Sequence, residues 1–204
     1  MSIAIIKYNA GNIRSVLFAL ERIGVEAMVT DDKEQIRKAD KVIFPGVGEA
    51  ASAMAYLRER NLDKAIIELK QPVLGICLGM QLMCNHSEEN DTTCLGIVPV
   101  NVRRFSTLTS SMSPGGNQTL KVPQIGWNNL YNLKSPLFNE VEEDSYVYNV
   151  HSFYAADSPY TIAKCDYGVE YAAAVARDNF YGLQFHTEKS ASVGEQILKN
   201  FLSL

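Results

Sequence analysis

The stretch QPVLGICLGMQLM, residues 71–83, decides how this chain folds. Its first half is an apolar run typical of a buried strand, and its second half, after Cys77, has apolar residues at helical spacing. The junction reads G-x-C-x-G, with Gly75 and Gly79 two positions to either side of Cys77. This pattern predicts a nucleophile elbow, a sharp strand-to-helix turn, and glycines suit it because they let strand and helix pass closely.

A cysteine at such a turn is a candidate nucleophile. It precedes a helix, whose N-terminus is the positive end of the helix dipole, and this favours the reactive thiolate form. The alternative is a small buried cysteine that only fills space in the core. Nucleophilic catalysis by Cys77 also needs a base and an orienting carboxylate, which must come from other parts of the chain.

The composition is that of an ordinary globular protein. The 204 residues are 47% hydrophobic and 21% charged, enough for one well-buried domain spanning residues 1–204. The net charge of −4, without a basic stretch, does not indicate a nucleic-acid or membrane partner. The N-terminal apolar run is too short for a signal peptide, and no stretch reaches transmembrane length. We therefore expect a cytoplasmic protein.

The cysteines and histidines exclude some kinds of chemistry. The four cysteines form no C-x-x-C pair, which favours free thiols over a disulfide framework. No cluster of His, Cys and Asp has the spacing of metal ligands, so we expect no metal site. Only three histidines are present, so any histidine-dependent catalysis must use His86, His151 or His186.

Strands and helices alternate through the first half of the chain. Strands are predicted over residues 2–8, 25–30, 41–45 and 73–77, and helices over 13–23, 31–36, the region of 53–58, and 63–70. Such alternation predicts βαβ units and a parallel sheet with right-handed crossovers.

The second half has a different pattern. A polar surface loop is predicted over 106–119 and a last helix over 188–204. Strand-like runs separated by turn residues occur at 96–105, 121–131, 145–155, 160–167, 170–178 and 179–185. Their short spacing predicts antiparallel strands added to the parallel core. The expected fold is a single α/β domain with a mixed, mainly parallel sheet flanked by helices.

The stretch GLQFHTEKS, residues 182–190, offers the missing base and carboxylate. His186 follows a predicted strand, and Glu188 stands two positions later, so in an extended segment both side chains point the same way. Strand ends converge on one edge of an α/β sheet, which makes Cys77, His186 and Glu188 a candidate triad. A lone histidine at a strand end is more often structural, but the His-x-Glu spacing together with the elbow favours catalysis.

The stretch PGVG, residues 45–48, closes the third predicted strand. Continued as G-V-G-E-A-A, it mimics the dinucleotide-binding fingerprint, but that fingerprint belongs after the first strand. We interpret it as a flexible loop beside the nucleophile, whose peptide N–H groups bind a developing oxyanion together with the N–H of Leu78. The acidic stretch SEEND, residues 87–91, is mainly a solvated turn in which one carboxylate could meet a substrate ammonium.

These stretches resemble a known family. GICLGMQLM and GLQFHTEKS look like the class I (triad) glutamine amidotransferases. Further segments are similar to the HisH-type glutaminase subunits of imidazole glycerol phosphate synthase: KYNAGNIRSV (7–16), FPGVG (44–48), VPQIGWN (122–128) and YVYNVHSFY (146–154). The resemblance runs from the first strand to the last helix. One departure is Thr187, which replaces the family's proline and removes a constraint on the backbone of His186.

The resemblance implies a mechanism. Cys77 attacks the side-chain amide of L-glutamine, His186 shuttles protons, and Glu188 orients His186. The N–H groups of Val47 and Leu78 form the oxyanion hole, ammonia leaves, and water then releases glutamate from the thioester. The resemblance also implies the residues that contact the glutamine, which are Gly48, Gln81, Glu89 and Ser152.

The resemblance implies a partner as well, and no cofactor. The partner is a separate cyclase subunit with a (βα)8 barrel, and the two chains form a heterodimer. The cyclase uses the ammonia on a phosphoribosyl-aminoimidazole-carboxamide substrate to make imidazole glycerol phosphate and AICAR in histidine biosynthesis. The interface positions that this chain matches are Asn12, Trp127, Tyr148 and Lys189.

Two other hypotheses compete with this one. The chain could be another cysteine hydrolase of similar fold, resembling the DJ-1/PfpI group. The late F-H-x-E-K-S motif, the separate glycine-rich loop and the match across 121–154 argue against it. The chain could also be a non-catalytic subunit that regulates the cyclase, although the presence of Cys77, His186 and Glu188 argues against that. Glutamate release in the presence of the partner, and labelling of Cys77 by a glutamine-mimicking reagent, discriminate among the three.

Overall fold

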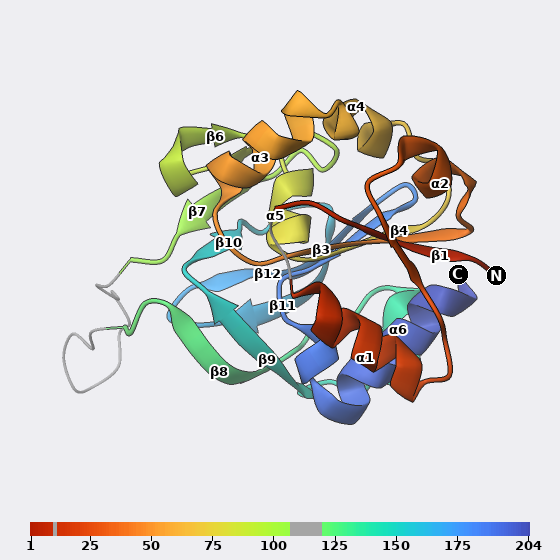
Figure 1. Ribbon diagram of the computed structural model, residues 1–204. Helices are drawn as coiled ribbons and strands as arrows, with labels where there is room; N and C mark the ends of the chain where they lie inside the picture. Colours follow the sequence, from red (N-terminus) through yellow and green to blue (C-terminus); the bar gives the residue numbers. More distant parts are fainter. Residues whose placement is uncertain (10–11, 107–119) are drawn as a thin grey trace, which may run out of the picture.

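The molecule is built around one mixed β-sheet, shown in the computed structural model of Figure 1. The structure describes residues 1–9, 12–106 and 120–204. Within these ranges the sheet has eleven strands in the order β2-β1-β3-β4-β13-β12-β10-β7-β5-β6, with β11 beside β12. The predicted loop over 106–119 lies outside the described residues, apart from its first position.

Five strands form the parallel core. Four come from the first half of the sequence, as predicted, but the fifth, β13, comes from the second half, where the spacing predicts antiparallel strands; it pairs parallel with β4 and antiparallel with β12. The pairs β1–β2, β1–β3, β3–β4 and β4–β13 are all parallel. The strands are β1 (Ile3–Ile6), β2 (Met28–Thr30), β3 (Lys41–Gly46), β4 (Val73–Cys77) and β13 (Phe180–Leu183). All residues of β1, β3 and β4 are buried, as expected of parallel strands that are covered on both faces.

Helices cover both faces of this core (Figure 1). One face packs against α2 (Lys33–Lys38), α3 (Ala50–Glu59), α4 (Leu62–Ile67) and α5 (Leu78–Met83). The other face packs against α1 (Ile13–Arg22) and α6 (Ala191–Ser203). Because side chains alternate along a strand, Ala4 and Ile6 of β1 join the first cluster while Ile3 and Ile5 join the second.

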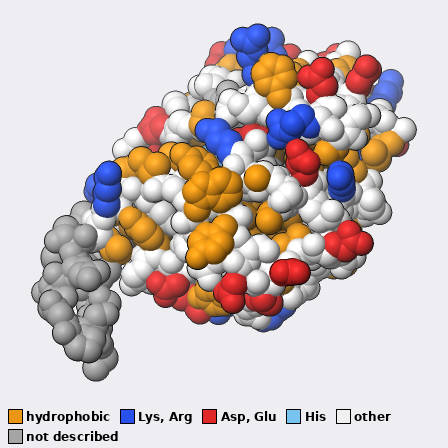
Figure 2. Space-filling model, turned by 90° about the horizontal axis from the view of Figure 1, so that it is seen from below, with side chains coloured by type: hydrophobic (Ala, Val, Ile, Leu, Met, Phe, Trp, Pro, Cys, Tyr) orange, Lys and Arg blue, Asp and Glu red, His pale blue; other side chains and the backbone are white. Residues whose placement is uncertain are grey.

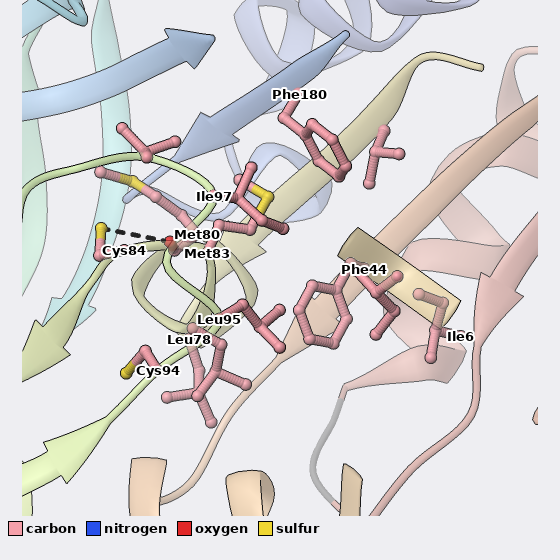
Figure 3. Close-up of a cluster of buried hydrophobic side chains, with 14 of the residues drawn as sticks. Ile6, Phe44, Leu78, Met80, Met83, Cys84, Cys94, Leu95, Ile97 and Phe180 are labelled. Carbon is pink, nitrogen blue, oxygen red and sulfur yellow. Dashed lines mark hydrogen bonds between the residues drawn. The ribbon is translucent and has the colours of Figure 1, made fainter. Parts of the chain in front are cut away.

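The cluster on the α5 side is drawn in Figure 3. Phe44 of β3 lies beside Leu78 of α5 and Leu95 of the segment after β6, and all three are buried. The Cys84 thiol donates a hydrogen bond to the Met80 carbonyl at 3.6 Å, which closes the end of α5. This packing fixes α5 against the sheet directly beside Cys77.

The antiparallel extension predicted for the second half is present. Strand β12 pairs antiparallel with β13, β10 and β11, and β10 pairs antiparallel with β7. At the edge, β5 runs parallel to β7 and antiparallel to β6. These strands are β5 (His86–Ser87), β6 (Thr92–Thr93), β7 (Asn101–Arg104), β10 (Phe153–Ala155), β11 (Thr161–Asp166) and β12 (Glu170–Arg177). The predicted fold, a mixed α/β sheet flanked by helices, is confirmed.

A separate two-stranded antiparallel ribbon lies below the sheet in Figure 1. It consists of β8 (Gln124–Asn129) and β9 (Tyr146–His151). Short 3-10 turns complete the fold at η1 (Glu89–Asp91), η2 (Pro136–Phe138) and η3 (Thr187–Lys189). Among the described residues, no helix combines the length and the apolar character that crossing a membrane requires.

Several predicted elements have different limits in the structure. The run 96–105 is a strand only at Asn101–Arg104, because Gly96 has a φ of +69° and Pro99 has no N–H to donate. The run 145–155 is interrupted at Ser152, between β9 and β10. The last helix begins at Ala191 rather than at 188, after the 3-10 turn η3.

Candidate active site

Cys77 occupies the predicted elbow. Strand β4 ends at Cys77 and helix α5 begins at the next residue. The backbone of Cys77 has φ +52° and ψ −109°, a conformation that side-chain-bearing residues avoid and that persists only where the surroundings enforce it. A Cβ on Gly79 would collide with the carbonyl oxygen of Phe44, and one on Gly75 would lie 2.9 Å from the nitrogen of Met80. Both glycines are therefore required for this turn.

His186 and Glu188 form a buried pair beyond the end of β13. The Nδ1 atom of His186 lies 2.8 Å from Oε1 of Glu188, and the two side chains are 3% and 1% exposed. Because a carboxylate only accepts, the ring donates through Nδ1, which leaves Nε2 for a second partner. The structure thus brings together the His-x-Glu pair as the spacing predicts.

The charge of His186 is set by its neighbours. Burial by itself lowers the pKa of the imidazole, but hydrogen bonds to Cys77 and Glu188, and the charges of both groups, outweigh burial and raise the pKa to about 10. The sulfur of Cys77 and the carboxylate of Glu188 therefore both favour the charged form of the ring.

Ser190 holds the backbone around Thr187, the residue that stands in the position of the expected proline. The peptide after His186 leads to Thr187, which is buried, and the hydroxyl of Ser190 donates to the carbonyl of His186 at 2.6 Å. The same hydroxyl accepts from the N–H of Tyr148 at 3.0 Å, and the N–H of His186 donates to the Tyr148 carbonyl at 2.9 Å. Hydrogen bonds to β9 therefore hold the segment 186–190 in place, where a proline ring would instead restrict its backbone.

A pocket of about 330 Å³ opens beside Cys77 and His186. Its lining contains seven further residues that sequence reasoning proposed, which are Val47, Gly48, Leu78, Gln81, Glu89, Ser152 and Lys189. Gly48 has a φ of +114°, a conformation open to glycine but not to other residues. Glu188 does not line the pocket, because it stands on the Nδ1 side of His186.

Two polar side chains of the pocket have defined orientations. The amide nitrogen of Gln81 donates to the Phe153 carbonyl at 2.9 Å and to Oε1 of Gln184 at 3.1 Å. Both its N–H bonds are used, so its carbonyl oxygen is left for a ligand. Glu89 accepts from the N–H of Ala50 at 2.7 Å, and its partial burial raises the pKa of its carboxyl.

Three of the four predicted interface residues lie together, and one of them, Lys189, also lines the pocket. Trp127 of β8 is 54% exposed and meets Tyr148 of β9 edge-on, with ring centroids 5.9 Å apart. The Nζ of Lys189 lies 5.8 Å from the centre of the Tyr148 ring. Asn12 precedes α1, and its side chain accepts from the Ser15 hydroxyl at 2.6 Å.

The structure also reveals functional candidates that sequence reasoning missed. Gln184 is fully buried, and its amide nitrogen lies 3.9 Å from the sulfur of Cys77. His151 lines the pocket, but burial lowers the pKa of its ring to about 4, and Nδ1 donates to the Phe153 carbonyl at 2.8 Å. The sequence did contain a signal for Gln184. It is a polar residue in an otherwise apolar predicted strand, and because it stands two positions before His186, its side chain points to the same side of the strand as that of His186.

The fold and the site define a class: α/β proteins with a cysteine elbow at the end of one parallel strand and a buried His–Glu pair beyond the neighbouring strand. Within the described ranges, no group of three or more His, Cys, Asp and Glu side chains is arranged to hold a metal ion. Comparison with known proteins agrees with this class. The model of the family "Glutamine amidotransferase class-I" matches residues 4–204.

Similar proteins narrow the class further. The chain is 54% identical over 204 residues to the imidazole glycerol phosphate synthase subunit HisH of Bacteroides fragilis strain YCH46, covering 100% of both chains. It is 52% identical to the HisH subunit of Bacteroides thetaiotaomicron, again over 100% of both. Among solved structures, PurLQS from Thermotoga maritima has a TM-score of 0.72 at 19% identity, covering 99% of this chain and 97% of that one, which concerns the fold alone. The chain belongs to the class I glutamine amidotransferases, and within them to the HisH subunits of imidazole glycerol phosphate synthase.

Proposed function

We propose that this chain hydrolyses L-glutamine through a thioester on Cys77 and passes the ammonia to a separate (βα)8-barrel cyclase subunit. The observation that carries the proposal is the meeting of the Cys77 sulfur with the buried His186–Glu188 pair at one pocket. The other support is family membership, because the relatives that match along the full chain are HisH subunits.

The reaction follows from the positions of three side chains. The thiolate of Cys77 attacks the side-chain carbonyl carbon of glutamine, and charged His186 gives its proton to the leaving nitrogen, which departs as ammonia. The now neutral ring takes a proton from water, whose oxygen attacks the thioester carbon. Collapse releases glutamate and restores the thiolate and the charged ring. Glu188 holds Nδ1, so that Nε2 faces the sulfur throughout.

The oxyanion of each tetrahedral intermediate needs N–H donors. Leu78 is the first residue of α5, so its N–H has no partner within the helix and is free for this task. The loop after β3 supplies the second donor, the N–H of Val47, and both residues line the pocket. One such donor is worth about 10²–10³ in kcat.

The remaining pocket residues fit the rest of a glutamine molecule. The carbonyl oxygen of Gln81 and the carboxylate of Glu89 are acceptors, which suits the α-ammonium group. Gly48 and Ser152 complete the contacts, and neither brings a bulky side chain into the pocket. A pocket of this size suits a single amino acid.

The cyclase subunit would bind the face that carries β8 and β9. Ile125, Trp127 and Tyr146 are 57%, 54% and 60% exposed there, which is unusual for large apolar side chains on one ribbon. Figure 2 views the molecule from this side and shows hydrophobic side chains gathered in a band with charged ones around it. Lys189 lines the pocket and also approaches Tyr148, so this face lies next to the site of ammonia release.

The deciding experiment measures glutamate and imidazole glycerol phosphate together. The chain is assayed alone and with the cyclase and its phosphoribosyl-aminoimidazole-carboxamide substrate, and intact mass is recorded after treatment with a glutamine-mimicking affinity label. We expect glutamate to be released in the presence of the partner, imidazole glycerol phosphate and AICAR to be formed, and one adduct to be found on Cys77.

Each alternative gives another result. A regulatory subunit without catalysis would give neither glutamate nor an adduct. A cysteine hydrolase of another class would be labelled by reagents that do not mimic glutamine, and its activity would not respond to the cyclase. Either outcome would overturn the proposal.

A further inference from the structure

Gln184 connects the nucleophile to the pocket wall. It follows β13 (Phe180–Leu183) and is fully buried, and its backbone N–H donates to the Ala173 carbonyl at 2.9 Å. Its side-chain amide lies between two groups. The nitrogen is 3.9 Å from the sulfur of Cys77, and the oxygen accepts from Gln81 at 3.1 Å. A fully buried amide with both ends engaged is a specific arrangement rather than a space-filling one.

The direction of each amide in this chain of contacts is fixed by the next. The Phe153 carbonyl can only accept, and it accepts from Gln81 at 2.9 Å and from His151 at 2.8 Å. Gln81 must therefore turn its nitrogen toward Phe153 and Gln184. Gln184 must then turn its oxygen toward Gln81, because the opposite orientation would set two donors face to face. The consequence is an N–H of Gln184 aimed at the sulfur of Cys77.

We propose that Gln184 is a positioning residue for the glutaminase reaction, one that holds the sulfur of Cys77 and turns the carbonyl oxygen of Gln81 into the pocket. This inference rests on the proposed function. An N–H donor at the sulfur favours the thiolate over the thiol, and it keeps the sulfur from turning away from the substrate. The acceptor role of Gln184 prevents the Gln81 amide from flipping, which would present a donor to the substrate ammonium.

Two substitutions separate these effects from simple packing. In Gln184→Leu the side chain keeps a similar volume but loses both the donor and the acceptor. In Gln184→Glu the shape is kept, and burial favours the protonated acid, which donates its O–H to one neighbour and accepts from the other. As pH rises the acid ionises, the donor is lost, and a negative charge stands beside the sulfur.

The first measurement is the rate of Cys77 alkylation by iodoacetamide across a range of pH, followed by mass spectrometry of the Cys77 peptide. The second is steady-state kinetics with glutamine in the presence of the cyclase and its ligand. The matched control is Gln124→Leu, because Gln124 is also buried and its amide oxygen accepts from Tyr171 at 3.1 Å, outside the pocket lining.

We expect Gln184→Leu to slow alkylation about tenfold at neutral pH and to raise KM for glutamine about tenfold, as the loss of a buried hydrogen bond at each neighbour implies. We expect Gln184→Glu to approach the wild type at low pH and to fall progressively below it as pH rises. Gln124→Leu should keep the wild-type alkylation profile.

Wild-type alkylation rates and KM in both Gln184 variants would overturn the inference. So would a Gln184→Glu variant whose deficit does not change with pH, because that pattern indicates packing alone. If circular dichroism shows that Gln184→Leu does not fold, the isosteric Glu variant decides. The alkylation readout does not depend on turnover, so absence of glutaminase activity in the wild type would count against the proposed function and not against the Gln184 contact.

Discussion

At the scale of single residues, Cys77 combines chemical and backbone constraints. Its positive φ would be easier for glycine, yet the reaction we propose needs a thiol at that position. Cys77→Ala should abolish glutamate release while costing only about 1–2 kcal/mol in the free energy of unfolding. Cys77→Gly should be equally inactive but about 1 kcal/mol more stable than Cys77→Ala, because the backbone strain is relieved. Activity assays and urea unfolding test both, and glutamate release by the alanine variant would contradict the role of Cys77.

The three histidines should differ sharply in their effect on activity. His186→Ala should lower kcat by about 10²–10⁴, the usual contribution of a general base. His86 pairs with Asp91 at 2.8 Å outside the pocket lining, so its substitution should have little effect. His151 lines the pocket, but with its pKa lowered to about 4 its ring is neutral at neutral pH, and its one N–H, on Nδ1, donates to the Phe153 carbonyl. Steady-state kinetics of the three alanine variants check this order, and a larger loss in His151→Ala would mean that the triad is misassigned.

The two buried histidines, His186 and His151, should change the free energy of unfolding with pH in opposite directions. The pKa of His186 is raised from 6.5 to about 10, so its contribution is full below pH 6.5 and is lost as pH rises toward 10. The pKa of His151 is lowered from 6.5 to about 4, so its neutral ring favours the fold above pH 6.5 and that advantage is lost as pH falls toward 4. At about 1.4 kcal/mol per pKa unit, these shifts correspond to roughly 5 kcal/mol for His186 and roughly 3 kcal/mol for His151.

Urea unfolding as a function of pH tests these signs. His151→Asn should flatten the acid side of the stability curve, between about pH 4 and 6.5, without changing the alkaline side. His186→Asn should do the reverse, between pH 6.5 and about 10. A variant whose curve runs parallel to that of the wild type throughout would show that its histidine does not titrate differently in the folded and unfolded chain.

At the scale of elements, the contact between α5 and β3 depends on the absence of a side chain at Gly79. Gly79→Ala would press a methyl group into the Phe44 carbonyl, so the helix must move away from the strand, at a cost of about 3 kcal/mol or more. The control is Gly24→Ala, where φ is +74° and nothing lies within 4 Å, so only the backbone penalty of about 1–2 kcal/mol applies. Equal losses of unfolding free energy in the two variants would rule out the steric explanation.

The elements of the first half could be predicted because their signals are local. Apolar runs, helix-starting residues and terminating glycines specify β1, α1, β3 and the elbow without help from the rest of the molecule. The predicted strand at 145–155 has no local signal for its interruption at Ser152. That break arises because β9 pairs with β8 while β10 pairs with β7 and β12, two different sheets.

The sequence predicts those parts of the candidate site that depend on the spacing of residues along the chain. The His-x-Glu pair and the elbow are sequence patterns, and so is the glycine-rich loop. The link from Cys77 through Gln184 and Gln81 to Phe153 is not, because it joins three segments of the chain whose proximity depends on the order of strands in the sheet. His151 illustrates the same limit, since only the folded structure shows that its ring is buried and bonded to the Phe153 carbonyl.

At the scale of the whole molecule, the strand order explains why distant segments meet. The strands β3, β4 and β13 are neighbours in the sheet and parallel. Their C-terminal ends therefore lie side by side at one edge, and they deliver Val47, Cys77 and His186 to one pocket. The ribbon β8–β9 then closes the pocket from outside the main sheet, since Val150 and His151 of β9 line it as well.

The loop after β3 lines the same pocket as the nucleophile and as β9 of the proposed partner face. The base of the loop is fixed, because the Tyr8 hydroxyl donates to the Pro45 carbonyl at 2.6 Å and Gly46 pairs with Cys77 in the sheet. The freedom to rotate therefore lies beyond Gly46, in the Gly46–Val47 peptide that carries the N–H of Val47 and in Gly48, whose φ is +114°. Val47 itself is 37% exposed. A partner bound at β8–β9 could bias this peptide between two orientations.

The chain alone should therefore be a poor glutaminase, and the cyclase with its ligand should raise kcat far more than it lowers KM. Ammonia released without an acceptor is lost, and an N–H donor that turns toward the oxyanion acts mainly on the transition state, worth about 10²–10³ in kcat.

Gly48→Pro should alter kcat while leaving complex formation near normal, because proline cannot adopt a positive φ. Trp127→Ala should instead weaken the complex by about 2 kcal/mol, roughly 30-fold in Kd, and leave the rate of the isolated chain unchanged. Steady-state kinetics of the chain alone, with the cyclase, and with the cyclase plus ligand test this, together with Kd by titration. Equal kcat in all three conditions would rule out gating by the loop while leaving the proposed triad untouched.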